Sequence, residues 1–150
     1  MVKIRKADID DVETITSFQI KMALETENLE LDKKTVKKGV TSVFKNKNKG
    51  QYYVAEENNK IIGSLLVTPE WSDWRNGTIL WIQSAYVALE YRRKGVFKYM
   101  YNHLKKQIKK SDNLLGLRLY VDKTNQSAQK TYEKLGMNDE HHKTYEWIKN

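Results

Sequence analysis

The sequence predicts an α+β fold, a mixed sheet with helices on both of its faces. Several apolar stretches are rich in the β-branched and aromatic residues that favour strands, and amphipathic stretches with helical spacing lie between them. The resulting order is strand, two helices, three strands, helix, strand, helix, strand, without an internal repeat or a linker. The helix that follows residues 79–87 is expected to be a crossover between two strands.

Length and composition limit the classes of protein that the chain can be. Its 150 residues suit one domain, residues 1–150, and a content of 39% hydrophobic and 31% charged residues is ordinary for a globular protein. No apolar run suits a transmembrane helix or a signal peptide, so the cytoplasm is the expected compartment and no membrane partner is expected. The absence of cysteine excludes disulfides and thiolate metal sites. His103, His141 and His142 show no metal-binding spacing, so no metal is expected.

The formal net charge of +8 favours anionic partners, and a nucleic acid is the obvious rival to a nucleotide cofactor. The densest lysines, in residues 33–49, alternate with apolar residues as on the outer face of an amphipathic helix. Trp71 and Trp74 lie in an acidic turn instead of among basic residues on an open sheet face. A solvated helix face therefore explains the charge better, and a basic nucleic-acid-binding module is kept as the third functional reading.

The start of the chain predicts a strand and two helices. Residues 2–5 alternate like an entering strand, and Asp8, with Asp11 three residues later, is typical of a helix N-cap. Asp32 is expected to cap a second helix that ends near Phe44. The polar connection between the two helices carries the carboxylates of Glu25, Glu27 and Glu30.

The middle of the chain predicts a hairpin and then a central strand. Residues 51–56 and 61–68 are expected to be two strands joined by the turn 57–60. Residues 70–77 are expected to form a turn, in which an Asn-Gly pair marks a tight bend before the strand 79–87.

A basic turn separates this strand from a helix that begins at Val96. It contains three cations and a glycine, in the order Arg92, Arg93, Lys94 and Gly95. A glycine-containing turn at a helix N-terminus directs several unpaired N–H groups at one spot, and the cations add a positive field, so the turn predicts a phosphate site. Neither the P-loop nor the dinucleotide glycine spacing is present. A solvated basic turn that only caps the helix is the alternative.

The end of the chain predicts a strand, a short helix and a last strand. Residues 115–121 form an apolar run, and residues 126–135 have helical spacing up to Gly136, which is typical of a helix C-terminus. Residues 122–125 are expected to be the loop between them. The aromatic-rich residues 141–148 alternate enough to predict the last strand.

Two stretches resemble the GCN5-related N-acetyltransferase (GNAT) superfamily. Residues 92–97 are similar to its pyrophosphate-binding signature, arginine-x-x-glycine-x-glycine or alanine, with Phe97 in place of the last residue. Residues 117–137 are similar to its second signature, in which a strand and a loop precede an asparagine, a small residue, an aromatic residue and leucine-glycine-methionine. The resemblance implies a mostly antiparallel sheet with a splay between its two central parallel strands.

The resemblance implies an acetyl-CoA-dependent N-acetyltransferase, with acetyl-CoA as acyl donor and an amine as acceptor. Acetyl-CoA would lie between the strands that end at Val87 and Val121, and backbone groups of Tyr86 and Val87 would pair with its pantetheine arm. Asn125 and Ala128 match the asparagine and the small residue of the second signature and are expected to bind the cofactor. The residues expected to hold the pyrophosphate are Arg92, Arg93, Lys94, Gly95, Val96, Phe97 and Lys98.

Tyr132 matches the family tyrosine that faces the thioester sulfur, and it is the expected general acid because a tyrosine stays protonated at neutral pH. The Val87 N–H is the expected oxyanion donor. Gln83 stands where some relatives carry a glutamate, so the base is expected to be a carboxylate of another element that acts through water. The alternatives are that Asn125 only caps a helix and that Tyr132 only fills the core.

The resemblance also implies that the helix connection and the loop before the central strand wall the acceptor site. Carboxylates beside indoles suit a cationic amine, although surface acids that balance nearby lysines are the alternative. The identity of the amine and the oligomeric state stay open, and members of the family often form homodimers. A non-catalytic acyl-CoA-binding sensor on the same fold is the second functional reading. The residues expected to bind the acceptor are Glu25, Glu27, Trp71, Asp73 and Trp74, with Glu30 and Glu70 beside them.

Overall fold

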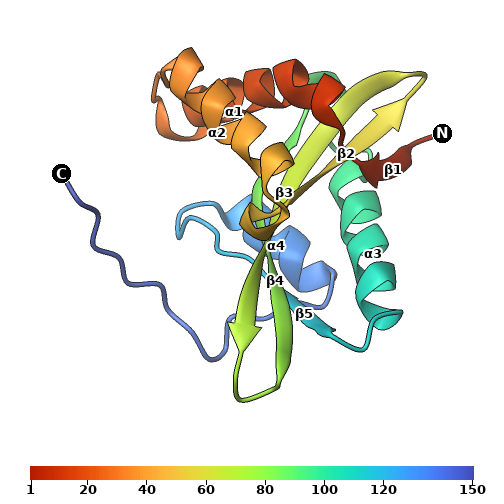
Figure 1. Ribbon diagram of the computed structural model, residues 1–150, viewed down its shortest axis with the longest axis vertical. Coiled ribbons are helices and arrows are strands. Elements are labelled where there is room, and N and C mark those ends of the chain that lie inside the picture. Colours follow the sequence, from red (N-terminus) through yellow and green to blue (C-terminus); the bar gives the residue numbers. More distant parts are fainter. The chain divides into compact units, whose positions relative to one another are not determined.

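The computed structural model describes residues 1–150, which divide into two compact units, Met1–Arg118 and Leu119–Asn150. The first unit holds a sheet and three α-helices, and the second holds one α-helix and the C-terminal segment (Figure 1).

The first unit is built on a five-stranded sheet in the order β1-β2-β3-β4-β5 (Figure 1). Neighbouring strands from β1 to β4 are antiparallel, and β5 runs parallel to β4 because helix α3 connects the two as a crossover. The sheet is therefore mixed and mostly antiparallel, as predicted. The strands are β1 (Lys3–Lys6), β2 (Gln51–Glu57), β3 (Lys60–Ser72), β4 (Gly77–Val87) and β5 (Leu114–Arg118).

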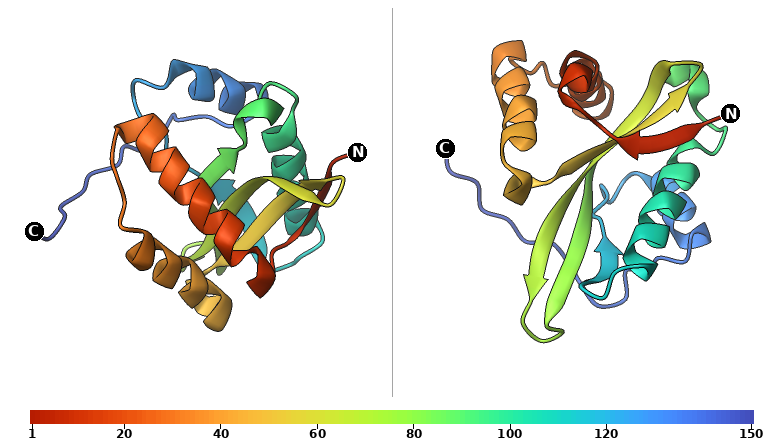
Figure 2. Two further views of the ribbon diagram at one scale, coloured as in Figure 1. Left: turned by 90° about the horizontal axis from the view of Figure 1, so that it is seen from above. Right: turned by 45° about the vertical axis from the view of Figure 1, so that its right-hand side comes forward.

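Helices cover both faces of this sheet, which confirms the predicted fold class. Helices α1 and α2 lie against one face and α3 against the other (Figures 1 and 2). Short 3-10 helices precede α1, β2 and the turn before α3. The helices of the first unit are η1 (Ile9–Asp11), α1 (Val12–Glu27), α2 (Lys33–Lys45), η2 (Lys47–Lys49), η3 (Leu89–Tyr91) and α3 (Val96–Lys109). The second unit holds α4 (Gln126–Lys134).

Side-chain caps begin the first helices where the sequence predicts them. Asp8 and Asp11 form a capping box, in which the Asp11 carboxylate accepts from the Asp8 N–H at 2.8 Å. Arg5 of β1 donates to the same Asp11 carboxylate at 2.8 Å, so the start of the helix is tied to the sheet. The Asp32 carboxylate accepts from the Thr35 N–H at 2.9 Å and caps α2.

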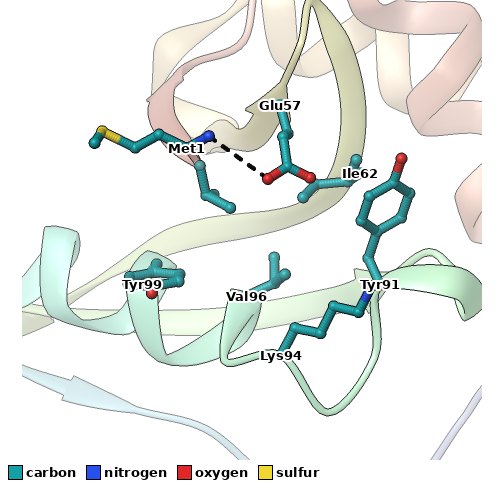
Figure 3. Close-up of a pocket in the computed structure, with 8 residues that line it drawn as sticks. Met1, Glu57, Ile62, Tyr91, Lys94, Val96 and Tyr99 are labelled. Carbon is teal, nitrogen blue, oxygen red and sulfur yellow. Dashed lines mark ion pairs between the residues drawn. The ribbon is translucent and has the colours of Figure 1, made fainter.

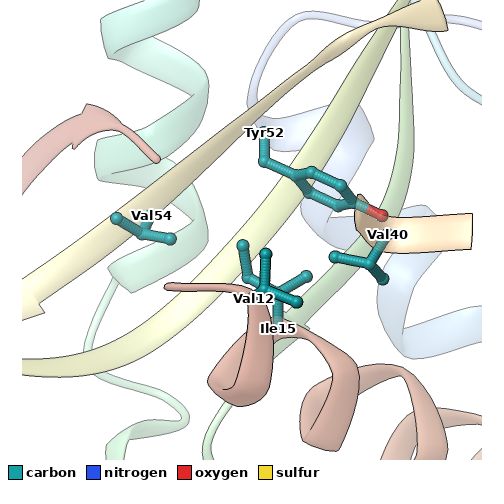
Figure 4. Close-up of a cluster of buried hydrophobic side chains, with 5 residues drawn as sticks. All are labelled: Val12, Ile15, Val40, Tyr52 and Val54. Atoms are coloured by element: carbon teal, nitrogen blue, oxygen red, sulfur yellow. The ribbon is translucent and has the colours of Figure 1, made fainter. Parts of the chain in front are cut away.

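Hydrophobic side chains pack on both sides of the sheet. For α1 and α3, the apolar spacing that predicts the helix is the spacing of the face that it buries. On the α3 side, the helix buries Val96, Met100 and Leu104. On the other side, the cluster between α1, α2 and β2 consists of Val12, Ile15, Val40, Tyr52 and Val54 (Figure 4).

Strand β3 runs further than the sequence predicts. The structure extends it to Ser72, and Trp71 pairs with Thr78 of β4, so the prediction of a turn over residues 70–77 is wrong for its first half. Pairing of β3 with β2 ends before Pro69, which therefore lies on a stretch with one open edge, where proline is tolerated. The β3–β4 hairpin consequently projects beyond β2 (Figure 2).

The C-terminal segment contains no strand, so the prediction of a last strand over residues 141–148 is wrong. Its alternating side chains are exposed, with exposed fractions of 89% for Tyr145 and 86% for Trp147. Alternation supplies only the side-chain pattern of a strand. A strand also needs neighbouring backbone groups to pair with its own N–H and C=O groups, and this segment pairs with none.

Candidate functional site

Strands β4 and β5 separate halfway along β4. Their parallel pairing covers only the stretch from Thr78, opposite Leu114, to Trp81, opposite Arg118. Strand β4 continues to Val87, so its second half has β3 on one edge and no strand on the other. This divergence is the splay that the resemblance implies. The predicted strand 115–121 is correspondingly shorter and ends at Arg118.

A β-bulge in the pairing with β3 lies in this part of β4, where β5 is no longer alongside. Ser64 of β3 pairs with Tyr86 and Leu66 pairs with Gln83, so one residue of β3 faces two residues of β4. Within the bulge Ser84 has a φ of 52°, a left-handed conformation that is uncommon for serine. The bulge changes the direction of the residues that follow it, and these are the residues at the opening.

The backbone of Val87 faces the opening. Val87 lies opposite Gly63, and the adjacent Ala88 N–H donates to the Ile62 carbonyl at 2.8 Å. Val87 is therefore at a non-hydrogen-bonded position relative to β3, and its own N–H and C=O point away from that strand. The Val87 carbonyl accepts a hydrogen bond from Nε of Arg92 at 2.8 Å. The predicted contacts of Tyr86 and Val87 with pantetheine stay predictions.

The turn between β4 and α3 is held in an open conformation by left-handed residues. Arg93 has a φ of 65° and Gly95 a φ of 80°. A Cβ at Gly95 would meet only the Tyr99 ring, at 3.9 Å, so the positive φ, and not crowding, requires glycine here. No side chain caps the N-terminus of α3, which leaves its first N–H groups available to an anion.

The side chains of the predicted phosphate turn differ in their surroundings. Arg93, Lys94 and Lys98 are exposed, whereas the Arg92 guanidinium turns toward α1. Phe97, the departure from the family signature, is half-buried, with its ring 6.4 Å from the Tyr101 ring. A large side chain at this position is therefore compatible with an open turn.

Glu25 of α1 links the helix to this turn. Its carboxylate accepts from Nη2 of Arg92 at 2.7 Å and from the Tyr86 hydroxyl at 3.3 Å. The guanidinium also lies 5.2 Å from the Tyr86 ring centroid, and that ring packs 4.9 Å from the Phe18 ring. Burial, together with the charge of Glu25, raises the pKa of the Tyr86 hydroxyl. Sequence reasoning assigned Glu25 to the acceptor and did not find its contact with Arg92.

The structure separates the residues predicted to bind the acceptor into two groups. Glu25 contacts Tyr86 near the end of β4, and Glu27 is exposed at the end of α1. Trp71, by contrast, pairs with Thr78 near the start of β4. It lies seven residues beyond Ser64, the partner of Tyr86, and seven residues at the strand rise span about 23 Å. Asp73 and Trp74 lie beyond Trp71 in the hairpin turn, and the two indoles have exposed fractions of 63% and 93%.

A polar cluster that the sequence analysis did not identify crosses the sheet where β4 and β5 begin to diverge. Nη1 of Arg118 on β5 and the indole N–H of Trp81 on β4 both donate to Glu70 on β3. Gln83 donates to Thr68 beside them. The hydrogen bond from Trp81, followed by that from Arg118, holds the pKa of Glu70 below its usual range although burial opposes it. A lone arginine in an otherwise apolar strand is the sequence signal for such a cluster.

Asn125 caps α4 within the second unit. Its Oδ1 accepts from the Ala128 N–H at 3.1 Å, so Asn125 is a helix N-cap. Tyr132 is the seventh residue of the helix, and burial raises the pKa of its hydroxyl, so the group is protonated at neutral pH. The contacts of these residues with acetyl-CoA stay predictions.

A pocket of about 530 Å³ lies beside the start of α3 (Figure 3). The Met1 amine and the Glu57 carboxylate form an ion pair at 3.7 Å at its edge. Lys94 and Val96 of the phosphate turn contribute to its wall, but no residue predicted to contact pantetheine or the acceptor does. Its other lining residues are Val2, Ile62, Tyr91 and Tyr99.

Two general features bear on the class of site. No group of three or more histidine, cysteine, aspartate or glutamate side chains is placed to hold a metal ion. None of the helices combines the length and apolar character that crossing a membrane requires.

Comparisons with known proteins agree with this arrangement. The model of the acetyltransferase (GNAT) family matches residues 18–137. The crystal structure of a possible acetyltransferase from Clostridium difficile 630 is 44% identical, with a TM-score of 0.93 over 100% of this chain and 99% of that chain. A predicted acetyltransferase from Clostridium acetobutylicum, solved with acetyl-CoA, is 25% identical, with a TM-score of 0.73 over 100% and 96% of the two chains.

A more distant structure shares the fold alone. An aminoglycoside acetyltransferase from an uncultured soil metagenomic sample, in complex with sisomicin, is 18% identical, with a TM-score of 0.76 over 99% of this chain and 96% of that chain. A search of curated proteins gave no match.

Proposed function

The chain belongs to the acetyltransferase (GNAT) family, and we propose that it moves the acetyl group of acetyl-CoA directly to a primary amine of a small molecule or peptide. Membership of this family supports transfer of an acetyl group from acetyl-CoA. The amine acceptor and the single-step path are the proposal. One observation supports the donor site above all: the end of β4, which has no strand on its β5 side, leads through η3 and the basic turn to an uncapped helix N-terminus.

The donor suits this edge in two ways. A pantetheine arm contains amide groups, and the Val87 N–H offers them or the thioester oxygen a donor that no strand occupies. A diphosphate suits the first N–H groups of α3, with the exposed Arg93, Lys94 and Lys98 adding positive charge. The similar protein from Clostridium acetobutylicum was crystallised with acetyl-CoA, which supports the same donor here.

Direct transfer needs three groups besides the substrates. The amine nitrogen attacks the thioester carbon, the carbon–sulfur bond breaks, and the nitrogen loses a proton. We assign stabilisation of the oxyanion to the Val87 N–H and donation of a proton to the departing thiolate to the Tyr132 hydroxyl. Gln83 cannot act as a base. We therefore propose that the amine proton passes through a water molecule to a carboxylate of another element. The products are the N-acetylated amine and coenzyme A.

Because the residues predicted to bind the acceptor lie in two groups, a small amine and a peptide would contact different ones. A small amine held at the end of β4 cannot also contact Trp71, which is about 23 Å away along the strand, or Asp73 and Trp74 beyond it. We propose that Glu27 and its surroundings serve a small cationic amine. The hairpin residues take part only if the acceptor is as long as a peptide.

A non-catalytic acyl-CoA sensor is the second candidate, because Gln83 gives β4 no carboxylate base. An acetyl-CoA turnover screen over polyamines, amino acids, aminoglycosides and peptides, with free thiol as the readout, tests the proposal. We expect thiol release that depends on one class of amine and an acetylated product by mass spectrometry. Binding of acetyl-CoA without amine-dependent thiol release in any class would favour the sensor. Residues 1–150 as one domain, a cytoplasmic location and a homodimer stay expectations.

A further inference from the structure

We propose that Glu25 is a positioning residue for the acyl donor: its carboxylate holds the Arg92 guanidinium on the Val87 carbonyl and so fixes the edge and the turn that receive acetyl-CoA. The inference rests on the proposed function, because it assigns a role at the same donor site. It differs from the sequence-based expectation, which places Glu25 in the wall of the acceptor site.

Arg92 is held from three directions. Its Nε donates to the Val87 carbonyl at 2.8 Å, and its Nη2 donates to Glu25 at 2.7 Å. Its guanidinium lies 5.2 Å from the centroid of the Tyr86 ring, in the geometry of a cation–π contact. The fork of the guanidinium makes both hydrogen bonds in one orientation, which a lysine cannot reproduce. One side chain thus connects the end of β4, the turn and the last helical turn of α1.

Glu25 is the member of this network that comes from outside the turn. Arg92 and Val87 are only five residues apart, so their hydrogen bond closes a local loop and does not by itself connect the turn to α1. Glu25 contacts both Arg92 and the Tyr86 hydroxyl. The Tyr86 hydroxyl and the Arg92 guanidinium use different oxygens of this carboxylate. Glu25→Gln keeps only one acceptor oxygen and no charge, so one of the two donors loses its partner, and an arginine side chain held less firmly regains rotamer freedom.

The ion pair by itself is an exposed one, with exposed side-chain fractions of 37% for Arg92 and 40% for Glu25. Exposed pairs stabilise a fold little, so its effect is expected on the geometry of the site instead of on global stability. The pair also cancels the charge of Arg92 near the turn. The positive field for a diphosphate therefore comes from the exposed cations Arg93, Lys94 and Lys98.

The direction in which Glu25→Gln changes the affinity for acetyl-CoA distinguishes this role from two others. If Glu25 acted only by its charge, Glu25→Gln would remove repulsion of a polyanion and tighten acetyl-CoA binding. If it bound the acceptor, the substitution would raise the Michaelis constant of the amine and leave the dissociation constant of acetyl-CoA unchanged. Positioning predicts weaker acetyl-CoA binding and an unchanged Michaelis constant of the amine.

The experiment is calorimetric titration of acetyl-CoA into the wild-type chain, Glu25→Gln, Arg92→Gln and the double variant, followed by kinetics in which the amine is varied at saturating acetyl-CoA. Glu13→Gln is the matched control, since it removes the same charge from α1, near its start, where Glu13 pairs with Lys37. Thermal unfolding checks each variant for folding. Arg92→Lys is the second probe if Glu25→Gln is unstable, because it keeps the charge and loses the fork.

We expect Glu25→Gln and Arg92→Gln each to raise the dissociation constant about fivefold, and the double variant to be no worse than the weaker-binding single variant, because coupled residues are non-additive. Glu13→Gln should bind like the wild type. An unchanged or lower dissociation constant in Glu25→Gln, or multiplied effects in the double variant, would overturn the inference alone. If the wild-type chain itself did not bind acetyl-CoA, the proposed function would fail and this inference with it.

Discussion

Nη1 of Arg118 on β5 donates to both carboxylate oxygens of Glu70 on β3, at 3.0 and 2.9 Å, across the intervening strand β4. Trp81 of β4, the last residue that pairs with β5, donates its indole N–H to the same carboxylate. The cluster therefore ties three strands together where β4 and β5 begin to diverge. We infer that it holds the base of the opening at a fixed width.

Removal of either partner should destabilise the first unit modestly. Glu70→Gln and Arg118→Met are each expected to lower the free energy of unfolding by about 1 kcal/mol, with a coupling of about 0.5 kcal/mol in the double variant. The values are small because the exposed side-chain fractions are 38% and 27%. Urea unfolding measures the cycle. The exposed Glu13–Lys37 pair, as Glu13→Gln and Lys37→Met, should show no measurable coupling, and equal coupling in both cycles would contradict the prediction.

The same cluster should make stability depend on pH in one direction. The pKa of Glu70 is lowered from 4.5 in the folded chain, first by the hydrogen bond from Trp81 and then by Arg118, against the effect of burial. The folded state thus binds this proton less readily than the unfolded state, so the contribution is fully present above pH 4.5 and is lost as pH falls through the folded pKa. The stability difference between the wild type and Glu70→Gln should be constant from neutral pH down to about pH 5.5 and shrink below it.

Gly95 should be required for donor binding. A β-branched residue is strained at a φ of 80° and places a side chain where the backbone must approach a diphosphate. Gly95→Val is therefore expected to raise the dissociation constant of acetyl-CoA at least about tenfold, roughly 1.4 kcal/mol, by calorimetry.

Gly136→Val is the matched control for backbone strain, because Gly136 also has a left-handed φ, 92°, and no heavy atom would lie within 4 Å of a Cβ there. Both variants should lose stability, but only Gly95→Val should lose affinity. Equal affinity of Gly95→Val and the wild type would place the diphosphate elsewhere.

Local sequence signals predicted much of the first unit because each acts within a few residues. The capping aspartates Asp8 and Asp32 accept from N–H groups two or three residues away, so their position alone identifies the helix starts. The two features that local signals missed depend on distant partners. Whether Trp71 belongs to a turn or a strand is decided by β4, and residues 141–148 have a strand pattern but no partner.

In the candidate site, too, local features were predictable from the sequence and contacts between distant residues were not. The basic turn and its glycine were predictable, because the end of a strand, a glycine and a helix start follow one another within a short stretch of the chain. The contact of Arg92 with Glu25 joins residues 67 positions apart, and Arg118 and Glu70 are 48 apart. No spacing rule relates such pairs, so the sequence showed the charges and could not show which ones neutralise each other.

The two groups of candidate acceptor residues can be distinguished by kinetics. For a small amine, Glu27→Gln is expected to raise the Michaelis constant about threefold, as suits one exposed charge pair, while Asp73→Asn leaves it unchanged. For a peptide long enough to reach the hairpin, Asp73→Asn should raise it as well. Steady-state assays with the best acceptor of each class measure both. If neither variant changed the Michaelis constant for any acceptor, these carboxylates would only balance the surface charge.

Tyr132 has the protonation state that a general acid needs. Burial raises the pKa of its hydroxyl above 10.0, so the group carries its proton throughout the neutral range. The family resemblance directs this hydroxyl at the thioester sulfur, from which a thiolate departs. Donation of the proton at that moment lowers the barrier without changing how acetyl-CoA binds in the ground state.

Tyr132→Phe keeps the ring and removes only the hydroxyl, so the helix should stay folded. We expect turnover to fall about ten- to a thousandfold, a barrier increase of roughly 1.4 to 4 kcal/mol, while the dissociation constant of acetyl-CoA changes little. Tyr145→Phe is the control, because Tyr145 lies in the same unit and has an exposed fraction of 89%. Single-turnover kinetics must show that chemistry limits the rate. A wild-type rate under that condition would make Tyr132 a packing residue, and the thiolate would have to leave without a proton from the protein.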